Sequence, residues 1–123
     1  MNATTMAYLG DAVYELWVRR HLLETGMVKV KELHKAAVKY VCADTQARLL
    51  RQLTPDLDEK ESQIVLRGRN ANGNHPKRVD VITYRHATAF EALVGYWYLS
   101  GQKQRMEWAF QQAANMGTEE GDP

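Results

Sequence analysis

Apolar residues recur at helical spacing along almost the whole chain, and only a short stretch at 79–82 alternates as a strand would. The pattern predicts five helices, over residues 4–25, 30–53, 56–68, 83–99 and 103–115. Thr4 or Thr5 can cap the first and Asp56 the third, while glycine or proline follows or ends most of them. Residues 69–77 hold three Asn, one Gly and one Pro and predict a loop. The expected fold is an all-α bundle.

The composition predicts one folded domain. The chain has 123 residues, of which 45% are hydrophobic and 25% charged, which excludes wholesale disorder. No apolar run reaches the roughly 18 residues that span a bilayer, and no secretion signal precedes the first helix. The lone Cys42 excludes an internal disulfide and a multi-cysteine zinc site. We expect a soluble cytoplasmic protein without a membrane partner, with a catalytic domain over 1–116 and a flexible acidic tail over 117–123.

Positive charge is concentrated in one segment of the chain. The net charge of +1 alone argues against nucleic-acid binding. Residues 67–87, however, carry five Lys or Arg against a single acid, while the segments on either side are neutral or acidic. Its candidate RNA-binding residues are Arg67, Arg69, Asn70, Lys77, Arg78, Thr83, Tyr84 and Arg85. Such donors position a protein on phosphates and sugars, although a merely solvated connection stays an open alternative. The scarcity of aromatic residues favours a duplex over a stacked single strand.

Two acids occupy positions where apolar residues are expected. Asp11 lies inside the apolar first helix, directly after Gly10, and Glu91 is the only acid between 87 and 99, one turn before Gly95. A carboxylate on an apolar helix costs several kcal/mol unless it is paired or binds a metal ion. A shared divalent cation would explain both residues, because Mg²⁺ is typically held by one or two carboxylates, water and substrate phosphate.

Simpler interpretations stay open for each acid. Glu15 and Arg19 have the spacing of an ordinary helical ion pair, which leaves Glu15 a second-tier candidate for the site. Asp11 can be a surface acid near a helix N-terminus, and Glu91 can pair with a buried Lys or Arg.

The remaining candidates point to structure. Cys42 is expected to be an inert core thiol within the second helix, and the histidines His21 and His34 to be at or near the surface. Five aromatic residues are expected to be core or subunit contacts: Trp17, Tyr96, Trp97, Tyr98 and Trp108.

Four ordered sequence blocks resemble the ribonuclease III family. They are Tyr8-Leu9-Gly10-Asp11-Ala12-Val13, Arg67-Gly68-Arg69-Asn70-Ala71, Thr83-Tyr84-Arg85-His86 and Thr88-Ala89-Phe90-Glu91-Ala92-Leu93-Val94-Gly95. The two middle blocks are similar to the small bacterial variant called Mini-ribonuclease III. Full-length family members have further acids at the positions of Thr4, Ala7 and Thr88, and the small variant shares their loss.

The resemblance implies a ribonuclease III-type helical endonuclease domain of about five to seven helices, which forms a homodimer. It implies Mg²⁺-dependent cleavage of double-stranded RNA, with Mn²⁺ as a substitute, that leaves 5′-phosphate ends. The family's essential acids match Asp11 and Glu91, which are therefore the expected catalytic residues and metal ligands. Thr88 and His86 join Glu15 as second-tier candidates. The implied substrate is the precursor of large-subunit (23S) ribosomal RNA.

Two other functions are consistent with parts of the pattern. A catalytically silent ribonuclease III-like module would bind duplex RNA without cutting it, and the intact Asp11 and Glu91 argue against this alternative. An all-α nucleotide pyrophosphohydrolase also uses carboxylates on helices, but that class presents clustered E-x-x-E pairs. We interpreted the acids of 58–61 as part of a charged surface helix instead.

Overall fold

The computed structural model describes residues 1–71, 77 and 79–121, the last four of these by their backbone alone. Within these ranges the chain forms six α-helices and one 3₁₀ turn and no strand, which confirms the predicted all-α class. The helices are α1 (Ala3–Glu24), α2 (Val30–Val41), α3 (Ala43–Leu53), α4 (Glu59–Arg69), α5 (Val81–Leu99) and α6 (Lys103–Gly121). The 3₁₀ turn covers Thr54–Asp56, where Pro55 takes a helix-starting position.

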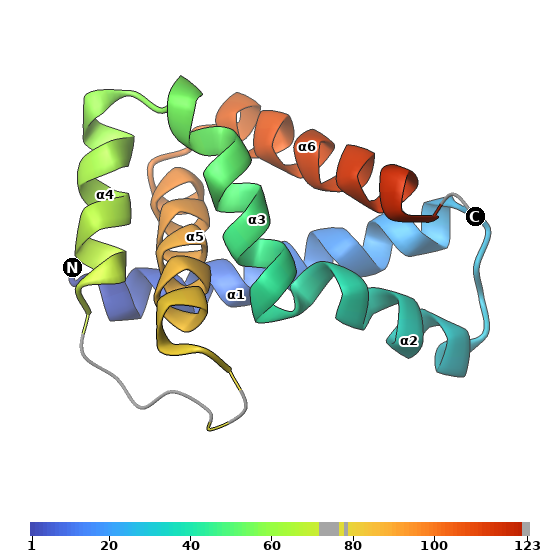
Figure 1. The fold of residues 1–123 in the computed structure, drawn as a ribbon. Helices are drawn as coiled ribbons and strands as arrows, with labels where there is room; N and C mark the ends of the chain where they lie inside the picture. Colours follow the sequence, from blue (N-terminus) through green and yellow to red (C-terminus); the bar gives the residue numbers. More distant parts are fainter. Residues whose placement is uncertain (72–76, 78, 122–123) are drawn as a thin grey trace.

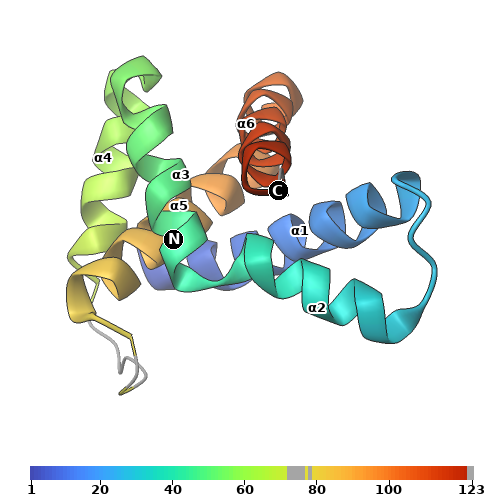
Figure 2. The ribbon, with the colours of Figure 1, turned by 45° about the vertical axis from the view of Figure 1, so that its right-hand side comes forward.

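Helix α5 lies at the centre of the molecule. It packs against α1, α3 and α4, and Figure 1 shows it between α4 and α3 with α1 crossing near its lower end. Helices α1 and α2 extend side by side to one side, and α6 lies above α1 (Figure 2). Every residue on α5 between 89 and 95 except Glu91 is buried, as the apolar sequence of this helix predicts.

The crossing of α1 and α5 depends on two glycines. A Cβ atom on Gly10 would collide with the backbone carbonyl of Glu91, and one on Gly95 would collide with the carbonyl of Met6. The two helix backbones therefore touch directly at this point, and no residue with a side chain fits there without moving a helix.

The core is built from residues of five helices among those that the structure describes. Tyr14 and Val18 come from α1. The Tyr14 hydroxyl donates a 2.9 Å hydrogen bond to the backbone carbonyl of Tyr40. The other large buried side chains come from α3, α4, α5 and α6: Leu49, Leu50, Leu53, Ile64, Phe90, Leu93, Val94, Trp97 and Phe110. In the described part of the chain, no helix is long and apolar enough to cross a membrane.

The predicted second helix is in fact two helices. Cys42 is extended (ψ 154°) and separates α2 from α3, so its expected place in the middle of a buried helix is wrong. Side chains from α3 replace the interrupted backbone hydrogen bonds: Thr45 Oγ1 donates to Lys39 O at 2.6 Å, and Gln46 Nε2 donates to Val41 O at 3.1 Å. Neither glycine nor proline marks the break, which is why the helical spacing appears continuous across it.

Side-chain caps place other helix ends at residues that differ from the prediction. Asp58, not Asp56, begins α4, because it forms a reciprocal capping box with Glu61. Asp80 accepts hydrogen bonds from the amides of Ile82 and Thr83, so α5 begins at Val81 and the strand-like 79–82 stretch is wrong. Helix α6 continues to Gly121, so part of the segment expected to be a loose tail is helical, while 122–123 lie outside the described residues.

A buried acid ties three helices together. Glu61 on α4 is fully buried, contrary to its expected place on a charged surface. Its carboxylate accepts hydrogen bonds from Trp97 Nε1 at 2.7 Å and from Arg105 Nη2 at 2.7 Å. Burial raises the pKa of Glu61, but the hydrogen bonds from Arg105, from the Asp58 amide and from Trp97 outweigh this effect and hold it below the ordinary value. The Arg105 guanidinium also lies 4.4 Å from the centre of the Trp108 ring.

The aromatic residues are mostly structural. Trp97 is fully buried, and Trp17, Tyr96 and Trp108 are half-buried against the core. Tyr98 is half exposed (53%), so the 96–98 stretch is not wholly internal.

The buried Glu61 gives a pH-dependent prediction. Glu61→Gln should lower the free energy of unfolding by about 2–4 kcal/mol at pH 7, because Arg105 loses its charged partner. The pKa of Glu61 is lower in the folded than in the unfolded protein. Its contribution to stability is therefore present at a pH above the ordinary carboxyl pKa and is lost as the pH falls through the folded pKa. The difference in the free energy of unfolding between wild type and variant should therefore become smaller in acid. Urea unfolding from pH 7 to pH 3 measures this difference. The exposed Glu59→Gln on the same helix should change stability by about 0.5 kcal/mol or less, and an equal loss there would contradict the assignment.

Candidate active site

Asp11 on α1 and Glu91 on α5 meet at the glycine crossing. Gly10 touches the backbone of Glu91, so the two acids project from the same contact point between the helices. The pKa of Glu91 is raised to about 8, first by burial and then by a hydrogen bond with Asp11 and the negative charge of Asp11. The structure thus brings together the two acids that the sequence singled out, and their role as one shared metal site stays a prediction.

Gln46 completes this group from α3. The residue is only 2% exposed, and its amide nitrogen donates to Glu91 Oε2 over a long distance of 3.5 Å as well as to the Val41 carbonyl. The hydrogen bond to Glu91 lowers the pKa of that carboxyl, but burial and Asp11 outweigh it. The amide oxygen of Gln46 is buried and has no hydrogen-bond partner among the described residues.

Sequence reasoning missed Gln46, although a signal was present. Gln46 takes the inward position of the repeat that continues through Leu49, Leu50 and Leu53. A polar residue at such a position is the same anomaly that singled out Asp11 and Glu91.

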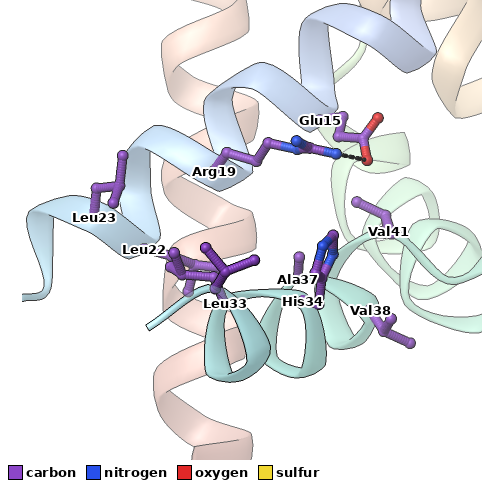
Figure 3. Close-up of a pocket in the computed structure, with 10 residues that line it drawn as sticks. Glu15, Arg19, Leu22, Leu23, Leu33, His34, Ala37, Val38 and Val41 are labelled. Carbon is purple, nitrogen blue, oxygen red and sulfur yellow. Dashed lines mark hydrogen bonds and ion pairs between the residues drawn. The ribbon is translucent and has the colours of Figure 1, made fainter. Parts of the chain in front are cut away.

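Glu15 lies one helical turn after Asp11 on α1 and has a partner within its own helix. It forms an ion pair with Arg19 at 3.1 Å, and the ordinary helical interpretation of the pair is confirmed. Figure 3 shows both side chains at the edge of an apolar groove between α1 and α2, whose other side is lined by Leu33, Ala37 and Val41. Of the other second-tier residues, Thr88 is half-buried one turn before Glu91, and the His86 ring hydrogen-bonds the Ile82 carbonyl at 2.9 Å.

The expected RNA-binding residues flank the connection between α4 and α5. Arg67, Arg69 and Asn70 end α4, while Thr83, Tyr84 and Arg85 occupy the first turns of α5, and Figure 1 shows these two helix ends at the same end of the molecule. Lys77 and the three arginines are exposed; Arg78 lies outside the described residues. The Arg67 guanidinium also donates to the Met1 carbonyl at 2.9 Å.

The basic end of the molecule is close to the acidic pair. Glu91 follows Arg85 by six residues on one continuous helix, which corresponds to about 9 Å along the axis. The arrangement places cationic side chains beside two carboxylates, which suits a polyanion that is held by the former and reacts at the latter.

The ligand set for a metal ion is small. Among the described residues no group of three or more His, Cys, Asp or Glu side chains is arranged to hold a metal. Asp11 and Glu91 supply two carboxylates, the number with which Mg²⁺ is commonly bound when substrate and water complete its shell.

The family described as the Ribonuclease III domain matches residues 4–102. The chain belongs to the ribonuclease III family. It is 62% identical to a Mini-ribonuclease 3 of Desulfitobacterium hafniense (strain Y51) over 98% of this chain and 76% of that protein. A Mini-ribonuclease 3 of Brevibacillus brevis is 53% identical over 91% of this chain and 84% of that protein. The crystal structure of a Fusobacterium nucleatum protein superimposes with a TM-score of 0.85 at 31% identity, covering 89% and 90% of the two chains.

Membership of this family confirms the resemblance read from the four sequence blocks and decides against a nucleotide pyrophosphohydrolase. The chain is an endoribonuclease of the ribonuclease III family, which acts on double-stranded RNA. The two acids that the crossing of α1 and α5 brings together both lie inside the matched region.

The raised pKa of Glu91 should make the cation-free protein less stable in alkali. Because the folded pKa of Glu91 is raised, ionising it opposes folding, and this loss accumulates as the pH rises from the ordinary carboxyl value toward about 8. Glu91→Gln should therefore raise the free energy of unfolding by at least ~1 kcal/mol at pH 8.5 in EDTA, with a smaller gain at pH 5. Thermal unfolding at the two pH values measures this, with Glu24→Gln as an exposed control. A Glu91→Gln variant less stable than wild type at pH 8.5 would contradict the geometry.

Proposed function

We propose that the chain cleaves double-stranded RNA with the help of Mg²⁺ held by Asp11 and Glu91. The observation that carries the proposal is the pairing of these two carboxyls at a buried helix crossing. Two adjacent acids repel one another when both are ionised, and a bound cation removes that repulsion.

The residues present fit a divalent cation. Both side chains offer hard carboxylate oxygens, the donors that Mg²⁺ and Mn²⁺ accept. The buried and unpartnered amide oxygen of Gln46 adds a polar atom beside Glu91 that lacks a hydrogen-bond donor. A cation bound here would supply a Lewis acid for a phosphate oxygen and a more acidic water.

The chain's own residues supply binding and orientation. Arg69, Lys77 and Arg85 are exposed cations at the end of the molecule next to the acidic pair, where they can hold the phosphates of a duplex. Asp11 on α1 and Glu91 on α5 would hold the cation between these two helices. The expected products carry a 5′-phosphate and a 3′-hydroxyl.

A homodimer is part of the proposal. Helix α1 exposes Tyr8 (83%) and Leu16 (70%), which lie two turns apart on the same side as the exposed Ala12. A second copy would cover this apolar stripe, which runs beside Asp11, and would bring two acidic pairs to one duplex.

We infer that the substrate is the precursor of 23S ribosomal RNA, which the enzyme trims at its ends in the cytoplasm. The support for this inference is the similarity to proteins named Mini-ribonuclease 3. Cleavage of transcribed precursor at defined positions near the mature ends, beside an unrelated duplex of equal length, tests it. Equal and unspecific cutting of both RNAs would reject the ribosomal substrate and leave the duplex endonuclease intact.

Asp11→Asn should abolish cleavage of a labelled RNA duplex. The change removes one of the two charged ligands without changing side-chain size, and a loss of at least about 100-fold in rate is expected. Glu15→Gln should keep most of the activity, because Glu15 is engaged with Arg19. Gel assays in Mg²⁺, Mn²⁺ and EDTA measure the rates, with Glu24→Gln as the charge control. Cleavage that survives Asp11→Asn would contradict the mechanism, and binding without cleavage by the wild type in every cation would restore the silent-module alternative.

Lys77→Ala should weaken duplex binding without moving the cleavage position. Loss of one phosphate contact is expected to reduce the slope of log affinity against log salt by about 1, equally for different duplex sequences. Lys103→Ala removes the same charge at the start of α6, beyond the other end of α5, and should leave the slope unchanged. Filter binding from 50 to 300 mM salt measures both. A shifted cleavage site in Lys77→Ala would contradict the positioning role.

A further inference from the structure

Among the described residues, Gln46 is the one with a buried polar side-chain atom that has no hydrogen-bond partner. An apolar residue would suit its inward position, since the next inward residues of α3 are Leu49, Leu50 and Leu53. Burying an amide without all of its partners costs roughly 1–3 kcal/mol. The chain keeps a glutamine there nonetheless, and its two amide atoms have different surroundings.

The amide nitrogen is fully used by the protein. One hydrogen bond goes to the Val41 carbonyl at the end of α2 (3.1 Å), and the other goes to Glu91 Oε2 (3.5 Å). The first bond anchors the amide to the α2–α3 junction, and the second holds one oxygen of Glu91. Because both acceptors lie on the nitrogen side, they also fix which atom of the amide is the oxygen.

The amide oxygen needs a donor that the described residues do not supply. It is buried, and no described residue donates a hydrogen bond to it. The carboxylate oxygen of Glu91 that the amide nitrogen contacts is an acceptor in that contact. Buried amide oxygens are nearly always satisfied by protein or by ordered water. A water in the hydration shell of a cation carries two polarised donors, one for a carboxylate and one for a neighbouring acceptor.

We propose that Gln46 is a positioning residue of the cation site, whose nitrogen holds Glu91 and whose oxygen accepts a hydrogen bond from a water of the cation's hydration shell. The assignment rests on the proposed function, since it needs a cation at Asp11 and Glu91. It adds a third side chain, from a third helix, to a site that two carboxylates alone leave sparse.

Binding of Mn²⁺ to the RNA-free protein tests the assignment, with electron paramagnetic resonance reporting the free ion. Gln46→Met keeps the length of the side chain and removes both polar atoms, and it should weaken Mn²⁺ binding about 10- to 100-fold. Gln52→Met, at an exposed position of the same helix, is the matched control and should bind as the wild type does. Asp11→Asn should lose the binding and thereby locates the ion.

Gln46→Glu separates the acceptor role from a structural one. It keeps a buried oxygen and adds a negative charge, so it should bind Mn²⁺ at least as tightly as the wild type. Its cleavage rate should fall, since it has no amide hydrogen for Glu91. A tenfold loss of Mn²⁺ affinity in Gln46→Glu would overturn the acceptor role, even if Gln46→Met fails to fold in a thermal unfolding control.

Kinetics distinguish the cation's water from the RNA as donor. In Gln46→Met the Mg²⁺ concentration for half-maximal cleavage should rise while the KM for RNA stays constant. A raised KM with unchanged Mg²⁺ dependence would show that an RNA hydroxyl is the donor and would overturn the proposal. Wild-type Mn²⁺ affinity in Gln46→Met, or no Mn²⁺ binding by the RNA-free wild type, would also overturn it. If the Gln46 proposal fails but the wild type shows Mg²⁺-dependent cleavage that Asp11→Asn abolishes, the proposed function still holds. A wild type without cleavage activity would reject the proposed function itself.

Discussion

The contact between the backbones of α1 and α5 is the constraint on which the site depends. Gly10 lies against the carbonyl of Glu91, and Gly95 lies against that of Met6, so the helices are closer than any side chain allows. This closeness places Asp11 beside Glu91 and buries the latter enough to raise its pKa. The same contact makes α5 the central helix, against which α3 and α4 then pack. The position of α5 and the raised pKa of Glu91 thus both depend on the absence of a Cβ atom at Gly10 and Gly95.

Two carboxylates lie along α5, Glu61 packed against it and Glu91 carried on it, and their pKa values are shifted in opposite directions. Near its C-terminal end, Trp97 and the neighbouring Arg105 satisfy Glu61, whose pKa falls. Near its middle, Glu91 has only the weak donor Gln46 and a like charge, and its pKa rises. The hydrogen bonds to Glu61 stabilise the fold. The repulsion between Glu91 and Asp11 would instead be relieved by a bound cation. Glu61 thus has the surroundings of a structural acid, whereas the surroundings of Glu91 are typical of candidate functional sites.

The sequence predicted the helical class and the acidic pair because both produce strong local signals. Asp11 and Glu91 interrupt apolar helices, and Gly10 and Gly95 accompany them. The break at Cys42 was missed because it depends on hydrogen bonds from Thr45 and Gln46, which no turn residue announces. Glu61 was placed on the surface because its partners, Trp97 and Arg105, are 36 and 44 residues away in sequence. Hydrophobic periodicity can be recognised in the sequence, whereas hydrogen bonds between polar residues far apart in sequence cannot.

The junction between α2 and α3 also limits how the length of the chain can change. Each residue added to a helix turns everything beyond it by about 100°. One residue inserted near Cys42 would rotate the inward face of α3 away from the core and carry Gln46 away from Glu91. The connection between α4 and α5 has no such dependence, since Asp80 starts α5 afresh with its own cap. Insertions and deletions among relatives should therefore collect between α4 and α5 and be absent between α2 and α3.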